Sequence, residues 1–159
     1  MHLRPIRRVA LAFATLSALA AGTAQAEVVA ANPMGVLKAL QDYGYAATMS
    51  TDNTGDPKIS AKVSKSNFVV FFYGCTDNAD CASVQFYVGY DVNGTVSALK
   101  MNEWNRNKLF SKATVDDEGD PALEMDVNLD FDGSGDQNFN DTLDIWRLSI
   151  EEFEEFIDW

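Results

Sequence analysis

The chain has 159 residues, of which 24 are acidic and 12 are basic, giving a formal charge of −12 at pH 7. A negative field of this size repels phosphate backbones and anionic lipid, so it excludes most roles in nucleic-acid binding. The only histidine is His2. The rest of the chain therefore lacks the base that serine and cysteine hydrolases use and the commonest zinc ligand.

The N-terminus predicts a signal peptide over residues 1–26. Arg4, Arg7 and Arg8 precede an uncharged run at 9–21, and small residues lead up to Ala26. We expect cleavage after Ala26, which leaves a periplasmic or secreted protein with nine basic and 24 acidic residues, a charge of −15. The apolar run is too short for a permanent membrane span, and the remaining length suits a single domain over 27–159.

The first expected helix covers residues 33–43. Asn32 is a favourable cap, and Pro33 stands where a helix tolerates proline. Apolar residues recur at helical spacing, and Gly44 is placed to end the helix in the left-handed conformation.

Four strands follow, at about 45–51, 58–64, 68–73 and 83–90, because the hydrophobic period changes to two between turn-forming clusters. The third is apolar on both faces, which is typical of a central strand that is covered twice or that uses its second face for contact. The fourth alternates, with Val84, Phe86, Val88 and Tyr90 pointing one way.

A second helix is expected at 95–108, then strands at 109–116 and 122–130, and finally an amphipathic helix at 140–157. The order α-β-β-β-β-α-β-β-α predicts an α+β fold in which an antiparallel sheet is flanked by helices.

Cys75 and Cys81 lie at the end of one expected strand and the start of the next. In an oxidising compartment the default is a structural disulfide. A redox site is the alternative, but the C-x-x-C spacing is missing.

Residues 130–141 follow a calcium-loop template, with glycine at the sixth position. Three features depart from it: the twelfth residue is aspartate, the eighth is glutamine, and the preceding segment is expected to be a strand. The alternative is an acidic turn that caps the last helix. We therefore assign no metal or other cofactor, and keep as a calcium hypothesis the residues Asp130, Asp132, Ser134, Asp136, Asn138 and Asp141.

Two carboxylate clusters could be considered as acid–base pairs: Asp52 with Asp56, and Asp116 with Asp117 and Asp120. Both lie in turns rich in glycine and proline, where carboxylates are normally solvated. We assign no catalytic residue.

Several aromatic side chains are candidates for a partner surface, although most aromatics in a domain of this size form its core. The candidates are Tyr73, Tyr87, Trp104, Phe156 and Trp159.

Several short phrases are spread over nearly all of residues 27–159. They are Asp42-Tyr43-Gly44-Tyr45, Gly55-Asp56-Pro57-Lys58-Ile59, Phe71-Phe72-Tyr73-Gly74-Cys75, Cys81, Met101-Asn102-Glu103-Trp104-Asn105, Gly119-Asp120-Pro121, and Trp146 with Phe153. Together and in this order they resemble the YbjN-domain family. The resemblance implies a fold like that of type III secretion chaperones, no catalytic residues, and a link to regulation of motility and stress responses.

The sequence thus predicts a non-enzymatic protein-binding module, chaperone-like or adaptor-like, with an unknown protein partner that the charge suggests is basic. Because chaperones of this fold often form dimers, a homodimer is also expected. The alternatives are an acidic inhibitor of a basic hydrolase such as a lysozyme, or a calcium-binding protein. Neither nucleic acid nor a membrane span after signal cleavage is expected.

Overall fold

The computed structural model describes residues 27–159, so the predicted signal peptide lies outside the described residues. None of the helices within 27–159 is long and apolar enough to cross a membrane. The elements follow in the order β1 (Glu27–Val28), α1 (Pro33–Tyr43), β2 (Thr48–Thr51), β3 (Pro57–Val63), β4 (Ser66–Tyr73), β5 (Ser83–Gly89), α2 (Ala98–Asn107), β6 (Lys112–Val115), β7 (Pro121–Asn128), β8 (Ser134–Gly135) and α3 (Asp136–Ile157).

The main sheet has six strands in the order β2-β3-β4-β5-β7-β6, and every neighbouring pair is antiparallel. β1 and β8 pair separately as a short ribbon. The predicted α+β fold with an antiparallel sheet and flanking helices is confirmed.

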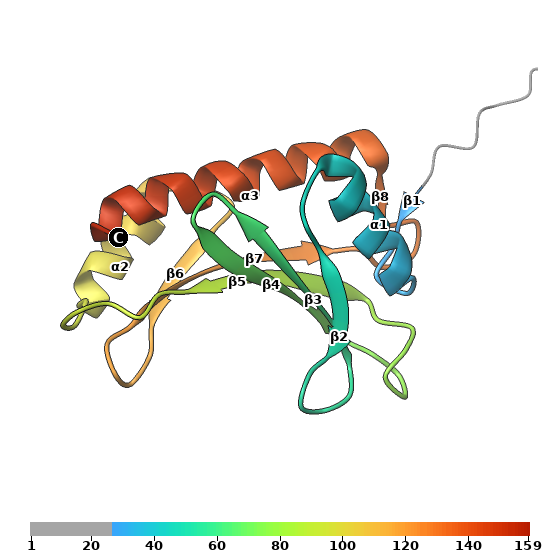
Figure 1. The fold of residues 1–159 in the computed structure, drawn as a ribbon, viewed down its shortest axis with the longest axis horizontal. Helices are drawn as coiled ribbons and strands as arrows, with labels where there is room; N and C mark the ends of the chain where they lie inside the picture. The colour runs from blue at the N-terminus through green and yellow to red at the C-terminus, as the bar shows by residue number, and fades with distance from the viewer. Residues whose placement is uncertain (1–26) are drawn as a thin grey trace, which may run out of the picture.

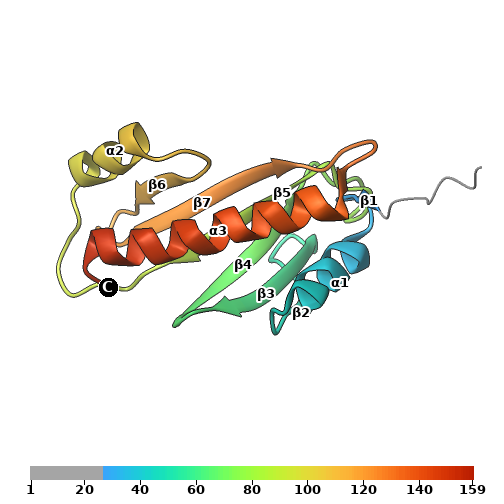
Figure 2. The same ribbon diagram turned by 90° about the horizontal axis from the view of Figure 1, so that it is seen from above.

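The helices lie on one side of the sheet (Figures 1 and 2). α3 runs along the length of that side, α1 lies beside its N-terminal half, and α2 lies near its C-terminal end and β6. This one-sided arrangement follows from the alternation of each strand: in β5, for example, Val84, Phe86 and Val88 are buried while the residues between them are not.

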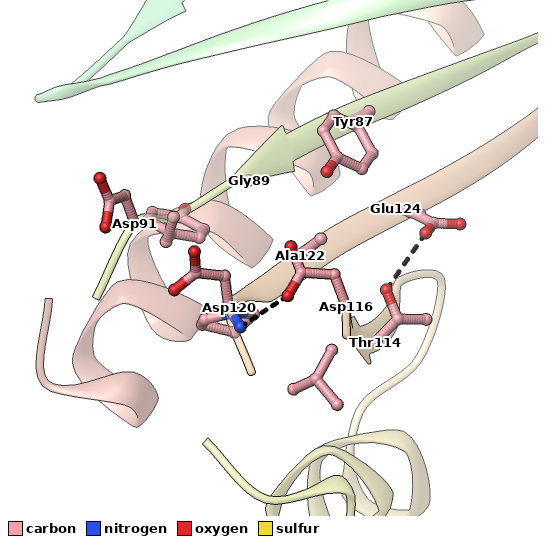
Figure 3. A pocket seen from close by; sticks show the side chains of 11 residues that line it. Tyr87, Gly89, Asp91, Thr114, Asp116, Asp120, Ala122 and Glu124 are labelled. Carbon is pink, nitrogen blue, oxygen red and sulfur yellow. Dashed lines mark hydrogen bonds between the residues drawn. The ribbon is translucent and has the colours of Figure 1, made fainter. Parts of the chain in front are cut away.

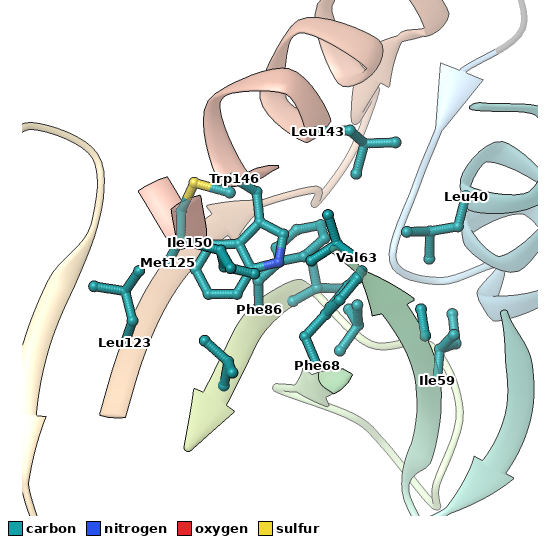
Figure 4. Close-up of a cluster of buried hydrophobic side chains, with 14 of the residues drawn as sticks. Leu40, Ile59, Val63, Phe68, Phe86, Leu123, Met125, Leu143, Trp146 and Ile150 are labelled. Atoms are coloured by element: carbon teal, nitrogen blue, oxygen red, sulfur yellow. The ribbon is translucent and has the colours of Figure 1, made fainter. Parts of the chain in front are cut away.

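The core is centred on Trp146 of α3, which is fully buried (Figure 4). Its ring lies 6.1 Å from that of Phe68 in β4 and 5.7 Å from that of Phe86 in β5, measured between centroids. Leu143 and Ile150, one helical turn to either side, extend this contact along the sheet. A second aromatic group joins Trp104 of α2 to Phe153 of α3, with 5.0 Å between centroids.

α1 forms for the reasons that the sequence indicated. The Asn32 side chain accepts a hydrogen bond from the Gly35 amide at 3.1 Å, and Gly44 ends the helix with φ of 113°. Its last residue, Tyr43, donates a hydrogen bond to Asp144 of α3 at 2.5 Å, which fixes α1 against the long helix.

Some predicted boundaries were wrong. α3 begins at Asp136 rather than at 140. The Asp136 carboxylate lies in the first turn of the helix, where it complements the helix dipole. β6 begins at Lys112 rather than at 109, because Phe110 adopts the left-handed conformation with φ of 68° and breaks the strand. β1 and β8 were not predicted; their two-residue lengths give no periodic signal.

The outer edge of β6 is closed by a side chain. Asn105 of α2 accepts a hydrogen bond from the Ala113 amide at 2.8 Å and donates one to the Ala113 carbonyl at 3.0 Å. It thus replaces a neighbouring strand at that position. Trp104, the preceding residue, points into the core and donates to the Ser111 hydroxyl at 3.3 Å.

We expect Trp146→Ala to lower the free energy of unfolding by about 3–5 kcal/mol, since it leaves a cavity beneath α3. The matched control is Leu99→Ala on the exposed side of α2, which should change the free energy by less than about 0.5 kcal/mol. Urea denaturation followed by circular dichroism measures both. Equal effects of the two variants would contradict the placement of the core.

We expect Asn105→Ala to lower the free energy of unfolding by about 1–2 kcal/mol, because it leaves the N–H and C=O groups of Ala113 without their partner. Asn102→Ala removes the same side chain from an exposed position of the same helix and should be within about 0.5 kcal/mol of the wild type. Faster hydrogen exchange of the Ala113 amide in the first variant alone would locate the effect at the sheet edge.

Candidate functional site

The side of the sheet opposite the helices carries a group of apolar and aromatic residues. We call it the open face and define it by Val69, Phe71 and Tyr73 of β4 and Tyr87 of β5. No helix among residues 27–159 covers this side (Figure 1). Phe71 and Tyr87 pack edge to face with 6.0 Å between ring centroids, and Tyr73 keeps 48% of its surface exposed.

Charged residues border the open face on both sides. Lys58 of β3 lies directly opposite Phe71, and Glu124 of β7 lies directly opposite Tyr87. Glu124 also pairs with Lys112 of β6 at 2.7 Å, and the hydrogen bond between them raises the pKa of Lys112. This border is therefore basic at β3, whereas at β7 it is acidic and partly neutralised.

A cavity of about 500 Å³ opens at one end of the open face, between β5, β6 and β7 (Figure 3). Its lining includes Tyr87 and the carboxylates of Asp91, Asp116, Asp120 and Glu124. A β-carbon at position 89 would lie 3.0 Å from the Tyr87 hydroxyl. Glycine at this position therefore leaves room for the Tyr87 side chain. The cavity joins an aromatic wall to an acidic wall, which is a chemistry suited to a basic group.

The two carboxylate clusters turn out to build turns of the same design, D-x-x-G-D-P. In the first, Asp52 accepts hydrogen bonds from the Thr54 amide at 2.8 Å and the Asp56 amide at 3.0 Å. In the second, Asp116 accepts from the Glu118 amide at 2.9 Å and the Asp120 amide at 2.9 Å. The glycine of each turn has positive φ, 95° in Gly55 and 89° in Gly119.

These contacts also set the charge state of Asp52. The Thr54 hydroxyl, followed by backbone amides, stabilises the carboxylate and lowers its pKa below the ordinary value. In each cluster the first aspartate, Asp52 or Asp116, thus stabilises its own turn by accepting backbone hydrogen bonds.

The five predicted partner-surface aromatics do not form one surface. Tyr73 and Tyr87 lie on the open face, four residues apart along the β4–β5 pair. Phe156 is half-buried against Trp104, and Trp159 packs on Tyr90 at the C-terminus. The prediction that Trp104 belongs to a partner surface was wrong. Its side chain is 1% exposed and lies in the core, because its face of α2 turns toward α3.

The disulfide between Cys75 and Cys81 is present and joins the ends of β4 and β5. Between them, Asp77 and Asn78 both have positive φ and form a tight hairpin tip. The Asn78 amide donates to the Thr54 carbonyl at 3.1 Å and to Asp56 at 2.8 Å, so the disulfide hairpin and the first D-x-x-G-D-P turn support each other.

The predicted calcium loop is divided between three structures: a turn at 130–133, strand β8, and the first turns of α3. Asp130 accepts a hydrogen bond from the Phe131 amide at 2.9 Å, and β8 pairs with β1. Among residues 27–159, no three acidic, cysteine or histidine side chains are grouped so as to hold a metal ion. Calcium binding through this segment stays a prediction.

Tyr87 gives the open face a pH-dependent signal. Burial, followed by the charges of Glu124 and Asp116, raises its pKa above the ordinary tyrosine value. The neutral form of Tyr87 is thus favoured in the folded state. Its contribution to stability is fully present below the pKa of tyrosine in the unfolded chain and is lost as the pH rises through the folded-state pKa. As the pH rises above about 10, we therefore expect the wild type to lose more free energy of unfolding than Tyr87→Phe. Unfolding midpoints measured at a series of pH values test this expectation, and parallel pH curves for the two proteins would refute it.

Comparison with known proteins supports the resemblance in the sequence. Residues 33–159 match the YbjN family, which is described as "Putative bacterial sensory transduction regulator". A search among curated proteins found no match. Because the match extends from the first residue of α1 to the end of the chain, it covers every strand of the main sheet and all three helices. The chain therefore belongs to the YbjN family.

Proposed function

We propose that this protein is an exported, non-enzymatic binding module, chaperone-like or adaptor-like, which holds a protein partner on the open face of its sheet. The observation that carries the proposal is the composition of that face. In antiparallel sheets with one covered side, the other side is normally polar. Here the two central strands present Val69, Phe71, Tyr73 and Tyr87 to the outside, alongside the polar residues Asn67, Ser83 and Gln85.

An apolar group on a surface costs free energy unless something covers it, and such patches commonly mark interaction sites. Aromatic residues are the side chains most enriched at the centres of interfaces, with a polar rim around them. The open face has this anatomy: Phe71 and Tyr87 at its centre, and Lys58 and Glu124 at its borders.

Charge favours a basic partner. The span 27–159 has 24 acidic and nine basic residues, and the cavity beside Tyr87 adds four carboxylates to one end of the open face. Complementary charge speeds association and fixes the orientation of the partner.

Export is supported by the N-terminal pattern of charged, apolar and small residues and by the disulfide, which is typical of oxidising compartments. The family description suggests that binding serves regulation. In an exported protein, such regulation would act through proteins outside the cytoplasm.

The acidic cavity favours a second candidate function, inhibition of a basic hydrolase such as a lysozyme. An excess of this protein at low salt would then slow the lysis of bacterial cells by lysozyme. An undiminished lysis rate removes this candidate and leaves the main proposal in place.

The main proposal predicts position-specific crosslinking. A photoreactive residue in place of Tyr73 should capture a bacterial periplasmic protein, whereas the same residue in place of Leu99, which is 79% exposed on α2, should not. Adding Phe71→Ser should reduce the yield at position 73 by about fivefold or more, since it removes the centre of the apolar patch.

Mass spectrometry identifies the captured chain. A second copy of this protein would establish the homodimer instead of a foreign partner. Equal capture at both positions, or none at position 73, would contradict a role for the open face.

A further inference from the structure

One half of β7 has no neighbour on its outer side. β6 pairs with Pro121–Glu124, where its last partners are Lys112 and Glu124, while β7 continues to Asn128. At about 3.4 Å per residue, this leaves an unpaired edge of about 14 Å along residues 125–128. We call it the free edge.

The backbone groups of the free edge point outward at alternate residues. Near the ends of β7, the Leu129 amide donates to the Ala82 carbonyl and the Pro121 carbonyl accepts from the Tyr90 amide, so odd-numbered residues face β5. The N–H and C=O groups of Asp126 and Asn128 therefore face away from β5. They make no hydrogen bond to other backbone groups among residues 27–159.

A strained residue keeps β6 from covering this edge. Phe110 would continue β6 opposite Asp126, but its φ of 68° turns the chain away, and the Ser111 amide bonds to the Leu109 carbonyl instead. A bulky residue rarely adopts this conformation, and strain of this kind is found mainly at functional sites. Phe110 is also 69% exposed, so the strain is not offset by burial of its ring.

A groove of about 380 Å³ lies beside the free edge. Its apolar lining residues are Phe110, Met125, Val127 and Ile145, and its polar ones are Asp126, Asn128, Asn138, Asp141 and Thr142. Phe110 and Ile145 also line a second hollow of about 330 Å³, together with Leu148. The two hollows are therefore neighbours on either side of the Phe110 and Ile145 side chains.

We propose that the free edge binds an extended segment of another protein, which adds to the sheet as a short strand in line with β6. Strand addition supplies affinity through main-chain hydrogen bonds and specificity through alternate side chains. On the helix side, every second residue of the segment is apolar and enters the groove beside Phe110. On the other side, the intervening residues are basic and face the Asp126 carboxylate. This carboxylate accepts a hydrogen bond from Gln85 at 2.7 Å and lies 3.9 Å from the Lys112 ammonium, but its side chain stays 67% exposed.

Charge distinguishes this occupant from a second copy of the chain. A two-fold pair of free edges with Asp126 opposite itself, or with Asn128 opposite itself, places Asp126 across from Asp126 or Asp130 of the other copy, and like charges across a strand pair are destabilising. In the remaining register, with Asp126 opposite Asn128, the two Asp126 side chains are diagonal neighbours. A basic segment meets the same carboxylates favourably. The site lies at a different place from the open face and does not depend on it.

A synthetic peptide, Lys-Val-Lys-Val-Lys-Val-Lys with a fluorescent label, provides the probe. It should bind the protein with a saturable rise in anisotropy at physiological salt. N-methylation of the backbone amides at alternate residues should weaken binding by about tenfold in one of the two registers and much less in the other, because only one register faces the free edge. A peptide of the same composition with its valines adjacent should bind at least about fivefold more weakly.

Two variants of one residue isolate the edge. Asn128→Pro removes an outward N–H without removing a hydrogen bond to β5, whereas Asn128→Ala keeps that N–H. Both lose the side-chain contact with the Asp130 amide, so this loss cancels in the comparison. We expect about tenfold weaker peptide binding for the proline variant relative to the alanine variant.

Phe110→Gly supplies the matching test of the groove. Glycine adopts positive φ freely, so the thermal midpoint should stay the same or rise, while peptide affinity should fall by about fivefold or more. Loss of affinity together with a lowered midpoint would show unfolding instead, and would overturn the assignment of Phe110.

Strand addition is refuted if the peptide fails to bind at millimolar concentration, if both N-methylated registers bind alike, or if the two Asn128 variants bind alike. The Phe71→Ser variant of the open face should bind the peptide as the wild type does. Crosslinking at position 73 and peptide binding at the free edge can thus fail separately.

Discussion

The structure depends on the contact of α3 with the sheet, and Trp146 is its centre. The ring packs against Phe68 and Phe86 on the two central strands, while Leu143 and Ile150 extend the contact in both directions. α1 and α2 both contact α3, α1 through the Tyr43–Asp144 hydrogen bond and α2 through the packing of Trp104 on Phe153. One amphipathic helix therefore organises the core, which lies on one side of the sheet.

This one-sided packing leaves parts of the sheet uncovered. Strands that bury one side leave the other to solvent, and their edges remain open unless something closes them. Asn105 closes the outer edge of β6, whereas the outward groups of Asp126 and Asn128 on β7 stay without backbone partners among the described residues. The open face is a product of this one-sided packing and offers aromatic side chains. The free edge has another origin, the end of β6 at Lys112, and it offers backbone groups.

Local chemistry repeats where the architecture repeats. The turns that begin at Asp52 and Asp116 both use an aspartate to hold two downstream amides, a glycine with positive φ, and a proline that starts the next strand. Acidic residues concentrated in such turns account for part of the negative charge. The D-x-x-G-D-P spacing was visible in the sequence and could have identified both hairpins as one design.

The sequence by itself determined the local elements. The cap at Asn32, the period-two run through Phe86, the helical stripe through Trp146 and the pair Cys75–Cys81 each carry a signal within a few residues, and the structure confirms them. Tertiary structure alone decided which aromatics stay exposed. Trp104 and Tyr87 are both large aromatic residues, but packing across strands and helices buries the first and leaves the second partly exposed. The free edge was equally out of reach of the sequence, because it results from the left-handed turn at Phe110 and from the register of β6 on β7, and both are set by contacts between distant segments.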